Sequence, residues 1–141
     1  MNAENDELVI IEEVCQRAKK EKKLYGSDLL ILFQRFDVRL TKALDLVRNA
    51  KVSLHVFKPS ERKMWVVTGE HGEYLILPYA KFCSCSDFYF QITKELKVRV
   101  CYHLIAQKIA QLLDVYQKEE HGDEEYMPLL KKATSVTSSP A

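Results

Sequence analysis

Glycine is scarce in this sequence, which has four glycines among 141 residues. The chain has no G-x-S-x-G, no glycine-rich phosphate-binding loop and no G-x-G-x-x-G. It therefore lacks the motifs that mark a serine nucleophile, a bound nucleotide phosphate or a dinucleotide. No nucleophile–base pattern is recognisable either, and we expect a protein that is not an enzyme.

Long apolar runs and an excess of one charge are also missing. No uninterrupted apolar stretch approaches the roughly 20 residues of a membrane-spanning helix. Glu4, Asp6 and Glu7 stand where a secretory or transit peptide would carry basic residues, so we expect an intracellular protein. Lysine plus arginine number 21 and aspartate plus glutamate 20, a net charge of +1. This balance argues against a general electrostatic coat for nucleic acid.

The length suits one ordinary domain, or a small domain with helical extensions, and is too short for a barrel enzyme. The period of the apolar residues changes along the chain from about 3.6 to 2 and back. It predicts helices over 5–23, 28–36, 38–49 and 103–118, strands over 52–57, 63–68 and 73–79, and a short helix over 86–95.

This order predicts an α+β fold, in which N-terminal helices lead into a small antiparallel β-sheet of three strands and a C-terminal helix closes a metal site. We divide the chain into an N-terminal helical region (1–50), a zinc-finger domain (51–118) and an acidic segment with a disordered tail (119–141). The tail over 133–141 is rich in serine and threonine.

Three of the four cysteines are clustered with a histidine. Cys83-Ser84-Cys85 is followed, after a fifteen-residue spacer, by Cys101-Tyr102-His103. In a reducing compartment clustered cysteines are more often metal ligands than disulfides. Three thiolates and one imidazole form a tetrahedral set for structural zinc, so we predict a single Zn²⁺ held by Cys83, Cys85, Cys101 and His103. Ordinary buried cysteines beside a chance histidine, or a redox C-x-C pair, are the alternatives.

The spacing of these ligands predicts where they lie. Residues i and i+2 of an extended segment point the same way, so Cys83 and Cys85 can converge on one ion. On a regular helix i and i+2 point to different faces. We therefore expect Cys101 just before the last helix and His103 in its first turn. Four protein ligands leave no position for water or substrate, which argues against a catalytic zinc.

The remaining cysteine and histidines have simpler interpretations. Cys15 lies on an apolar helical stripe and is expected to be a core residue rather than a ligand. His55 alternates with core positions and is expected to face solvent, while His71 falls in a hairpin turn. His121 stands among acids, which favour its protonated form. His71 or His121 could compete as a metal ligand, but neither has a ligand partner at short spacing.

Aromatic and basic residues surround the zinc motif in sequence. The aromatic residues suit a packed shell around a small metal core better than a stacking platform for single-stranded bases. The basic residues suit a solvated surface better than a DNA-binding face, so we expect at most weak contact with single-stranded DNA. The aromatic residues are Tyr79, Phe82, Phe88, Tyr89, Phe90 and Tyr102, and the basic ones are Lys58, Arg62, Lys63, Lys81, Lys94, Lys97, Arg99 and Lys108.

The helix over 28–36 is apolar on nearly every side, more than one small sheet can cover. Part of it should stay exposed in a monomer and bind a protein partner. The residues concerned are Leu29, Leu30, Ile31, Leu32, Phe33 and Phe36.

The C-x-C, spacer, C-x-H pattern resembles the SWIM zinc-finger family. Over roughly residues 27–118, the stretch 43–47, the strand hairpin, the aromatic run 88–90 and the run Cys101 to Leu104 resemble the small SWIM proteins of the Shu complex. Residues 1–25 and the acidic stretch 119–125 lie outside that resemblance.

The resemblance implies a nuclear, non-enzymatic accessory factor of homologous-recombination DNA repair. Members of that family pair with RecA-type recombinase paralogues through their SWIM motif and promote recombinase filament assembly or stability on single-stranded DNA. A stand-alone DNA-binding zinc finger and a C-x-C thiol redox protein remain as alternatives. The balanced charge speaks against the first of these, because neutralising several phosphates requires a basic domain.

Overall fold

Helices occupy the first third of the chain and the strands follow. The computed structural model describes residues 3–69, 72–77, 82–85 and 100–134. The elements are α1 (Ala3–Ala18), α2 (Gly26–Phe36), α3 (Val38–Arg48), β1 (Val52–Lys58), β2 (Arg62–Gly69), β3 (Gly72–Leu77), β4 (Phe82–Cys83), α5 (Tyr102–Leu113), β5 (Gln117–Gly122), a 3-10 turn η2 (Asp123–Glu125) and α6 (Tyr126–Thr134). The α+β class predicted from the sequence is confirmed. None of the described helices is long and apolar enough to cross a membrane.

The sheet is larger than the three antiparallel strands predicted from the sequence. Its five strands lie in the order β4-β3-β2-β1-β5, and β5 runs parallel to β1 while the other pairs are antiparallel. Neither added strand leaves a clear sequence pattern. β4 has two residues, and β5 reads Gln-Lys-Glu-Glu-His-Gly with no alternating apolar residues.

The helix predicted over 103–118 ends early. Asp114 adopts the left-handed conformation, and its backbone N–H donates to the carbonyl of Ala110, which closes α5 at Leu113. The chain then turns into β5, so the boundary that we placed at residue 118 falls inside a strand. α6 extends through Thr134, into the segment predicted to be a disordered tail, and the short helix predicted over 86–95 lies outside the described residues.

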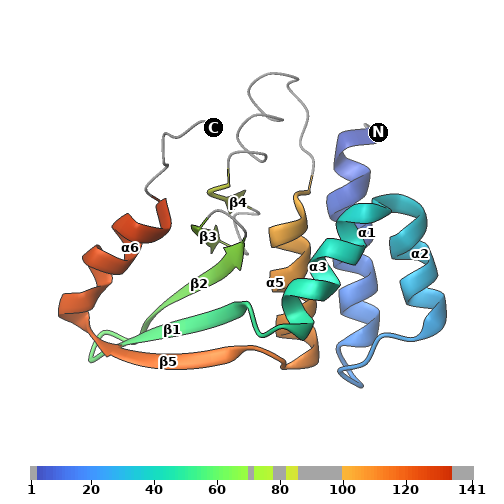
Figure 1. Cartoon of the computed structure of the whole chain (residues 1–141). Coiled ribbons are helices and arrows are strands. Elements are labelled where there is room, and N and C mark those ends of the chain that lie inside the picture. The colour runs from blue at the N-terminus through green and yellow to red at the C-terminus, as the bar shows by residue number, and fades with distance from the viewer. Residues whose placement is uncertain (1–2, 70–71, 78–81, 86–99, 135–141) are drawn as a thin grey trace.

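The two faces of the sheet carry two separate cores. The main core joins α1, α2, α3 and α5 to the face that presents Leu54, Trp65 and Ile76, which lie opposite one another on adjacent strands. The second core joins α6 to the other face through Phe57, Val66 and other residues. In Figure 1, α6 stands on the far side of the strands from α1, α2 and α3. The N-terminal helices therefore share the main core with α5 and the sheet.

Candidate metal centre

The structure brings the four predicted zinc ligands together. Cys83 ends β4, Cys85 follows two residues later, Cys101 immediately precedes α5, and His103 lies in the first turn of that helix. One ligand atom from each residue lies within 4.8 Å of the others. All four residues are buried, with exposed fractions of 5% or less. The placement at a strand end and a helix start is confirmed, although α6, not α5, is the last helix.

Ser84 explains why both neighbouring cysteines face the same way. Its hydroxyl accepts from the backbone N–H of Leu75 at 2.9 Å and donates to the carbonyl of Ala133 in α6 at 2.9 Å. The serine side chain is thereby held on the α6 side of the sheet. Because side chains alternate along an extended segment, Cys83 and Cys85 turn to the opposite side, toward α5.

The approach to Cys101 is fixed by the N-terminal helices. The backbone N–H of Val100 donates to Glu7 of α1 at 3.0 Å, and the carbonyl of Val100 accepts from Arg39 of α3 at 2.7 Å. Arg39 also forms a two-pronged ion pair with Glu7, with N–O distances of 2.7 and 2.9 Å. Both backbone polar groups of Val100 therefore hydrogen-bond to a half-buried ion pair. These bonds fix the backbone directly before Cys101.

His103 is the buried polar side chain that most needs a partner. Neither of its ring nitrogens hydrogen-bonds to a nitrogen or oxygen atom of the described residues, and the polar group beside the ring is the Cys85 thiol. The rings of Tyr74 and Tyr102 flank it, with centroids 4.5 and 4.2 Å away, which supports the packed-shell interpretation for Tyr102. An unsatisfied buried polar group costs about 1–3 kcal/mol. A metal ion bonded to the imidazole would remove that cost.

The three thiols are electrostatically unequal without a cation. Burial is the main cause that raises the pKa of Cys83 and of Cys101 above that of an ordinary thiol. The neighbouring Cys101 and Cys83 thiols hydrogen-bond to Cys85 and lower its pKa. A zinc ion binds thiolates, so it would stabilise all three sulfurs in the deprotonated form. Three sulfurs and one imidazole in a dry, closed cluster fit a structural zinc site.

Cys15 lies apart from this cluster. It packs against the main core, and it lines a cavity of about 380 Å³ together with Glu12 and Lys108. Burial raises the pKa of the Cys15 thiol to about 11.

Two of the basic residues near the motif are already paired with acids. Lys108 forms an ion pair with Glu12 at 3.1 Å, and Lys58 forms one with Glu61 at 2.7 Å. His71, Tyr79, Lys81 and the stretch 86–99, with its aromatic and basic residues, lie outside the described residues.

The prediction that His55 faces solvent is wrong. His55 is 7% exposed, because β5 lies beside β1 and adds a histidine of its own on the same face. The Nδ1 atom of His55 lies 2.8 Å from Nε2 of His121, although the two residues are 66 positions apart. Burial is the main cause that lowers the pKa of His55, and it favours the neutral imidazole. The only sequence signal near this pair is Glu119-x-His121. Its i, i+2 spacing places both side chains on one face only if the segment is a strand.

The comparisons with known proteins agree with the site. No protein-family model matches the chain. The chain is 26% identical over 137 residues to "Zinc finger SWIM domain-containing protein 7 homolog" of Dictyostelium discoideum, covering 96% of this chain and 88% of that protein. It is 29% identical over 126 residues to "Zinc finger SWIM domain-containing protein 7" of Mus musculus, covering 89% and 82%. The Homo sapiens protein of that name is 26% identical over 122 residues, covering 86% of each chain. These similarities and the buried Cys3His cluster support a zinc-binding protein of the SWIM zinc-finger type.

Proposed function

We propose that this protein is a non-enzymatic adaptor in homologous-recombination DNA repair. It holds one structural zinc ion, pairs with a RecA-type recombinase paralogue in the nucleus, and promotes assembly or stability of the recombinase filament on single-stranded DNA. The recombination role rests on the resemblance of the zinc motif and its flanking residues to the small SWIM proteins of the Shu complex. The exposed apolar face of α2 and the closed metal cluster support the adaptor role.

The outward face of α2 carries the proposal. Leu32 and Phe36 of this helix are buried in the main core, whereas Leu30, Ile31 and Phe33 are 59%, 39% and 44% exposed. Large apolar side chains grouped on one helix in this way are typical of a protein interface. The helix thus has one face for its own core and a second face available to a partner.

The metal cluster supports a structural rather than a catalytic use of zinc. Four protein ligands satisfy a tetrahedral ion, and all four are buried. An ion held there links the end of β4 to the start of α5. Its proposed role is to stabilise the fold that presents α2.

The test is co-expression of the full chain with each candidate RecA-type paralogue, followed by light scattering of the purified material. We expect a complex with one paralogue, and we expect Leu30→Asp with Phe33→Asp to abolish it. Met127→Asp is the matched control, because Met127 is 54% exposed on α6 and should leave pairing intact. Zinc content should be unchanged in both variants.

Two results would overturn the proposal. One is a stable, non-aggregating monomer with no affinity for any paralogue. The other is tight binding of the isolated chain to single-stranded DNA at physiological salt with a steep salt dependence, which would favour a stand-alone DNA-binding finger.

A further inference from the structure

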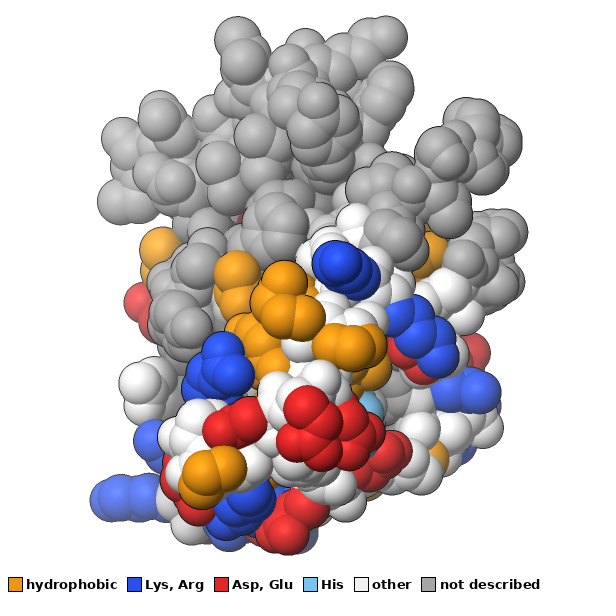
Figure 2. Space-filling model, turned by 90° about the vertical axis from the view of Figure 1, so that its left-hand side faces the viewer, with side chains coloured by type: hydrophobic (Ala, Val, Ile, Leu, Met, Phe, Trp, Pro, Cys, Tyr) orange, Lys and Arg blue, Asp and Glu red, His pale blue; other side chains and the backbone are white. Residues whose placement is uncertain are grey.

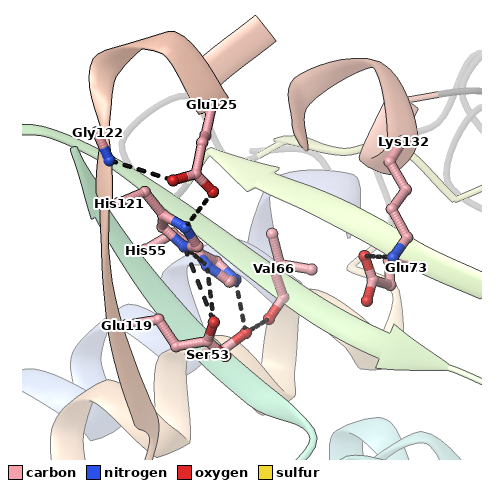
Figure 3. Close-up of polar contacts among 9 residues, drawn as sticks. All are labelled: Ser53, His55, Val66, Glu73, Glu119, His121, Gly122, Glu125 and Lys132. Carbon is pink, nitrogen blue, oxygen red and sulfur yellow. Dashed lines mark hydrogen bonds and ion pairs between the residues drawn. The ribbon is translucent and has the colours of Figure 1, made fainter. Parts of the chain in front are cut away.

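A second group of potential metal ligands lies on the α6 face of the sheet. His55 projects from β1, and Glu119 and His121 project from the neighbouring parallel strand β5 (Figure 3). His55 Nδ1 lies 2.8 Å from His121 Nε2, and Oε1 of Glu119 lies 4.0 and 3.8 Å from these two nitrogens. Three potential ligand atoms from three side chains therefore converge on one point.

The neighbouring groups suit the tautomers that a metal ion requires of the two histidines. The Ser53 hydroxyl lies 3.4 Å from the carbonyl of Val66 and 3.1 Å from Nε2 of His55. When Ser53 donates to Val66, its oxygen accepts from the Nε2–H of His55, and Nδ1 of His55 can bind an ion. Nδ1 of His121 lies 3.2 Å from Oε1 of Glu125, and a carboxylate only accepts, so Nδ1–H donates to Glu125 and Nε2 is the atom that can bind the ion.

In these tautomers the two lone pairs face each other. Nδ1 of His55 and Nε2 of His121 lie 2.8 Å apart, a distance at which a proton shared in an N–H···N hydrogen bond, or a cation in its place, joins the two rings. The carboxylate of Glu119 beside them adds a negative charge that favours a cation.

We propose that His55, Glu119 and His121 form a second metal site, separate from the cysteine cluster, which takes a divalent transition-metal ion such as Zn²⁺. Bonds of about 2.0–2.2 Å from a tetrahedral ion place its ligand atoms about 3.4 Å apart. The three separations of 2.8, 3.8 and 4.0 Å bracket that value, so small side-chain movements suffice. Two imidazoles with one carboxylate suit zinc and its neighbours better than Mg²⁺ or Ca²⁺, which require oxygen ligands.

The surroundings of the site resemble those of known metal centres. A histidine that binds a metal usually donates its other N–H to a carboxylate or another oxygen acceptor, which orients the ring. Glu125 lies in the position of such an acceptor for His121, and the Ser53 hydroxyl lies in that position for His55. Glu125 also accepts the backbone N–H of Gly122, and Phe57 stacks on His121 with ring centroids 5.1 Å apart. Glu125 is therefore a positioning residue, and its charge with that of Glu119 balances a divalent ion.

The site differs from the cysteine cluster in its access to solvent. The side chains of His55, His121 and Glu119 are 9%, 16% and 52% exposed. Figure 2 shows a histidine side chain at this face beside a group of acidic side chains. Three protein ligands leave one position of a tetrahedral ion for water or for a ligand from another molecule. The ion would therefore exchange with solvent more readily than one in the cysteine cluster.

The test uses the full, tag-free chain with the cysteine cluster already loaded with zinc. Zn²⁺ is titrated in against a chromophoric chelator, and Co²⁺ is titrated separately with absorption spectroscopy. We expect one further equivalent to bind, with a cobalt spectrum that lacks thiolate-to-metal bands. Glu119→Gln and His121→Ala should remove this equivalent, and Glu125→Gln should weaken it about 10- to 100-fold.

Glu120→Gln is the matched control. It removes the same charge from the same strand, but Glu120 pairs with Val56 in the register and therefore lies on the opposite face. It should bind the second equivalent as the unchanged chain does. Zinc content and circular dichroism of each variant establish that the cysteine cluster and the fold are intact. Absence of a second equivalent in the unchanged chain, as expected if the imidazoles share a proton, would overturn the proposal, as would its retention in His121→Ala.

Discussion

The two ligand clusters of this protein are built in opposite ways. The cysteine cluster is fully buried on the α5 face, and its ligands come in two pairs with one residue between the members of each pair. The cluster of His55, Glu119 and His121 lies at the rim of the α6 face, and its two histidines are 66 positions apart. A short motif assembles the first, and the pairing of β1 with β5 assembles the second. The comparison teaches that metal ligands close together in sequence can be recognised as a motif, whereas ligands brought together by strand pairing cannot.

The two clusters should also differ in what they contribute to stability. The cysteine cluster joins a strand end to a helix start across the main core, so its metal replaces contacts that the short β4 cannot supply. The histidine cluster lies between two strands that already pair along their length. Loss of the metal ion from the cysteine cluster should unfold part of the chain, and loss of the metal ion from the histidine cluster should not.

The largest expected effect tests this asymmetry directly. Cys83→Ser or His103→Ala should lose the zinc of the cysteine cluster and soluble expression, because binding of structural zinc is coupled to folding. His121→Ala should remain soluble and keep the zinc of the cysteine cluster. Elemental analysis and the yield of soluble protein measure both. Retention of a thiolate-bound zinc ion in His103→Ala would show that the ligand assignment is wrong.

A smaller effect tests whether the cysteine cluster depends on the N-terminal helices. Arg39→Ala should lower the free energy of unfolding by about 2–4 kcal/mol, because it removes the two-pronged ion pair with the half-buried Glu7 and a hydrogen bond to the carbonyl of Val100. Arg48→Ala removes an exposed ion pair with Asp45 and should cost less than about 1 kcal/mol. Urea denaturation of the zinc-loaded protein distinguishes the two. Equal midpoints would mean that residues 1–50 do not support the metal site.

A third prediction concerns how closely the sheet approaches His103. A Cβ added at Gly69 would lie 2.8 Å from a ring carbon of Tyr74 and 2.9 Å from Nε2 of His103. Gly69→Ala should therefore cost about 1–3 kcal/mol and slow the uptake of zinc by the apoprotein. At Gly26 an added Cβ meets nothing within 4 Å, so Gly26→Ala should leave the stability and the rate of zinc uptake unchanged. Unfolding midpoints and stopped-flow zinc uptake make the comparison, and an unperturbed Gly69→Ala would contradict the packing described around His103.

The smallest effect separates Cys15 from the cluster cysteines. Burial raises the pKa of Cys15 from 9.0 to about 11, so its thiol stays protonated at pH values where the unfolded thiol ionises. The unfolded chain then releases the proton first. This contribution to stability is therefore present below about pH 9 and is lost between about pH 9 and 11. Cys15→Ser should flatten the fall in stability over that window without changing zinc content. In zinc-loaded protein, rapid alkylation of Cys15 at pH 8 would contradict this environment.

The sequence predicted those elements whose signal is local. The helices near the N-terminus, the hairpin strands and the two halves of the cysteine motif all depend on residues a few positions apart. The structure places the helices and hairpin strands close to the expected bounds, except that the first helix ends at Ala18 and not at residue 23. The i, i+2 argument even located Cys101 before α5 and His103 in its first turn. Short-range geometry is enough to place such ligands.

The elements that escaped prediction depend on pairing over long distances. β5 has no apolar alternation, and it becomes a strand because its backbone pairs with β1. Without β5 and α6, the side of β1 that carries His55 and Phe57 would face solvent, which is why the sequence placed His55 at the surface. A charged segment without apolar alternation can therefore form an edge strand through backbone pairing, and its own side-chain pattern does not indicate this.

The composition of β5 has a consequence for how this protein can vary over evolution. β5 is an edge strand of the described sheet, so its outer backbone groups could template another chain. Its charged side chains, with glutamates at two successive positions, make it a poor template for such growth. A substitution of Lys118 or Glu120 by valine or isoleucine would give the edge the β-propensity that growth requires. Selection at Lys118 and Glu120 would then act against new contacts with other protein chains, and not for contacts within this protein.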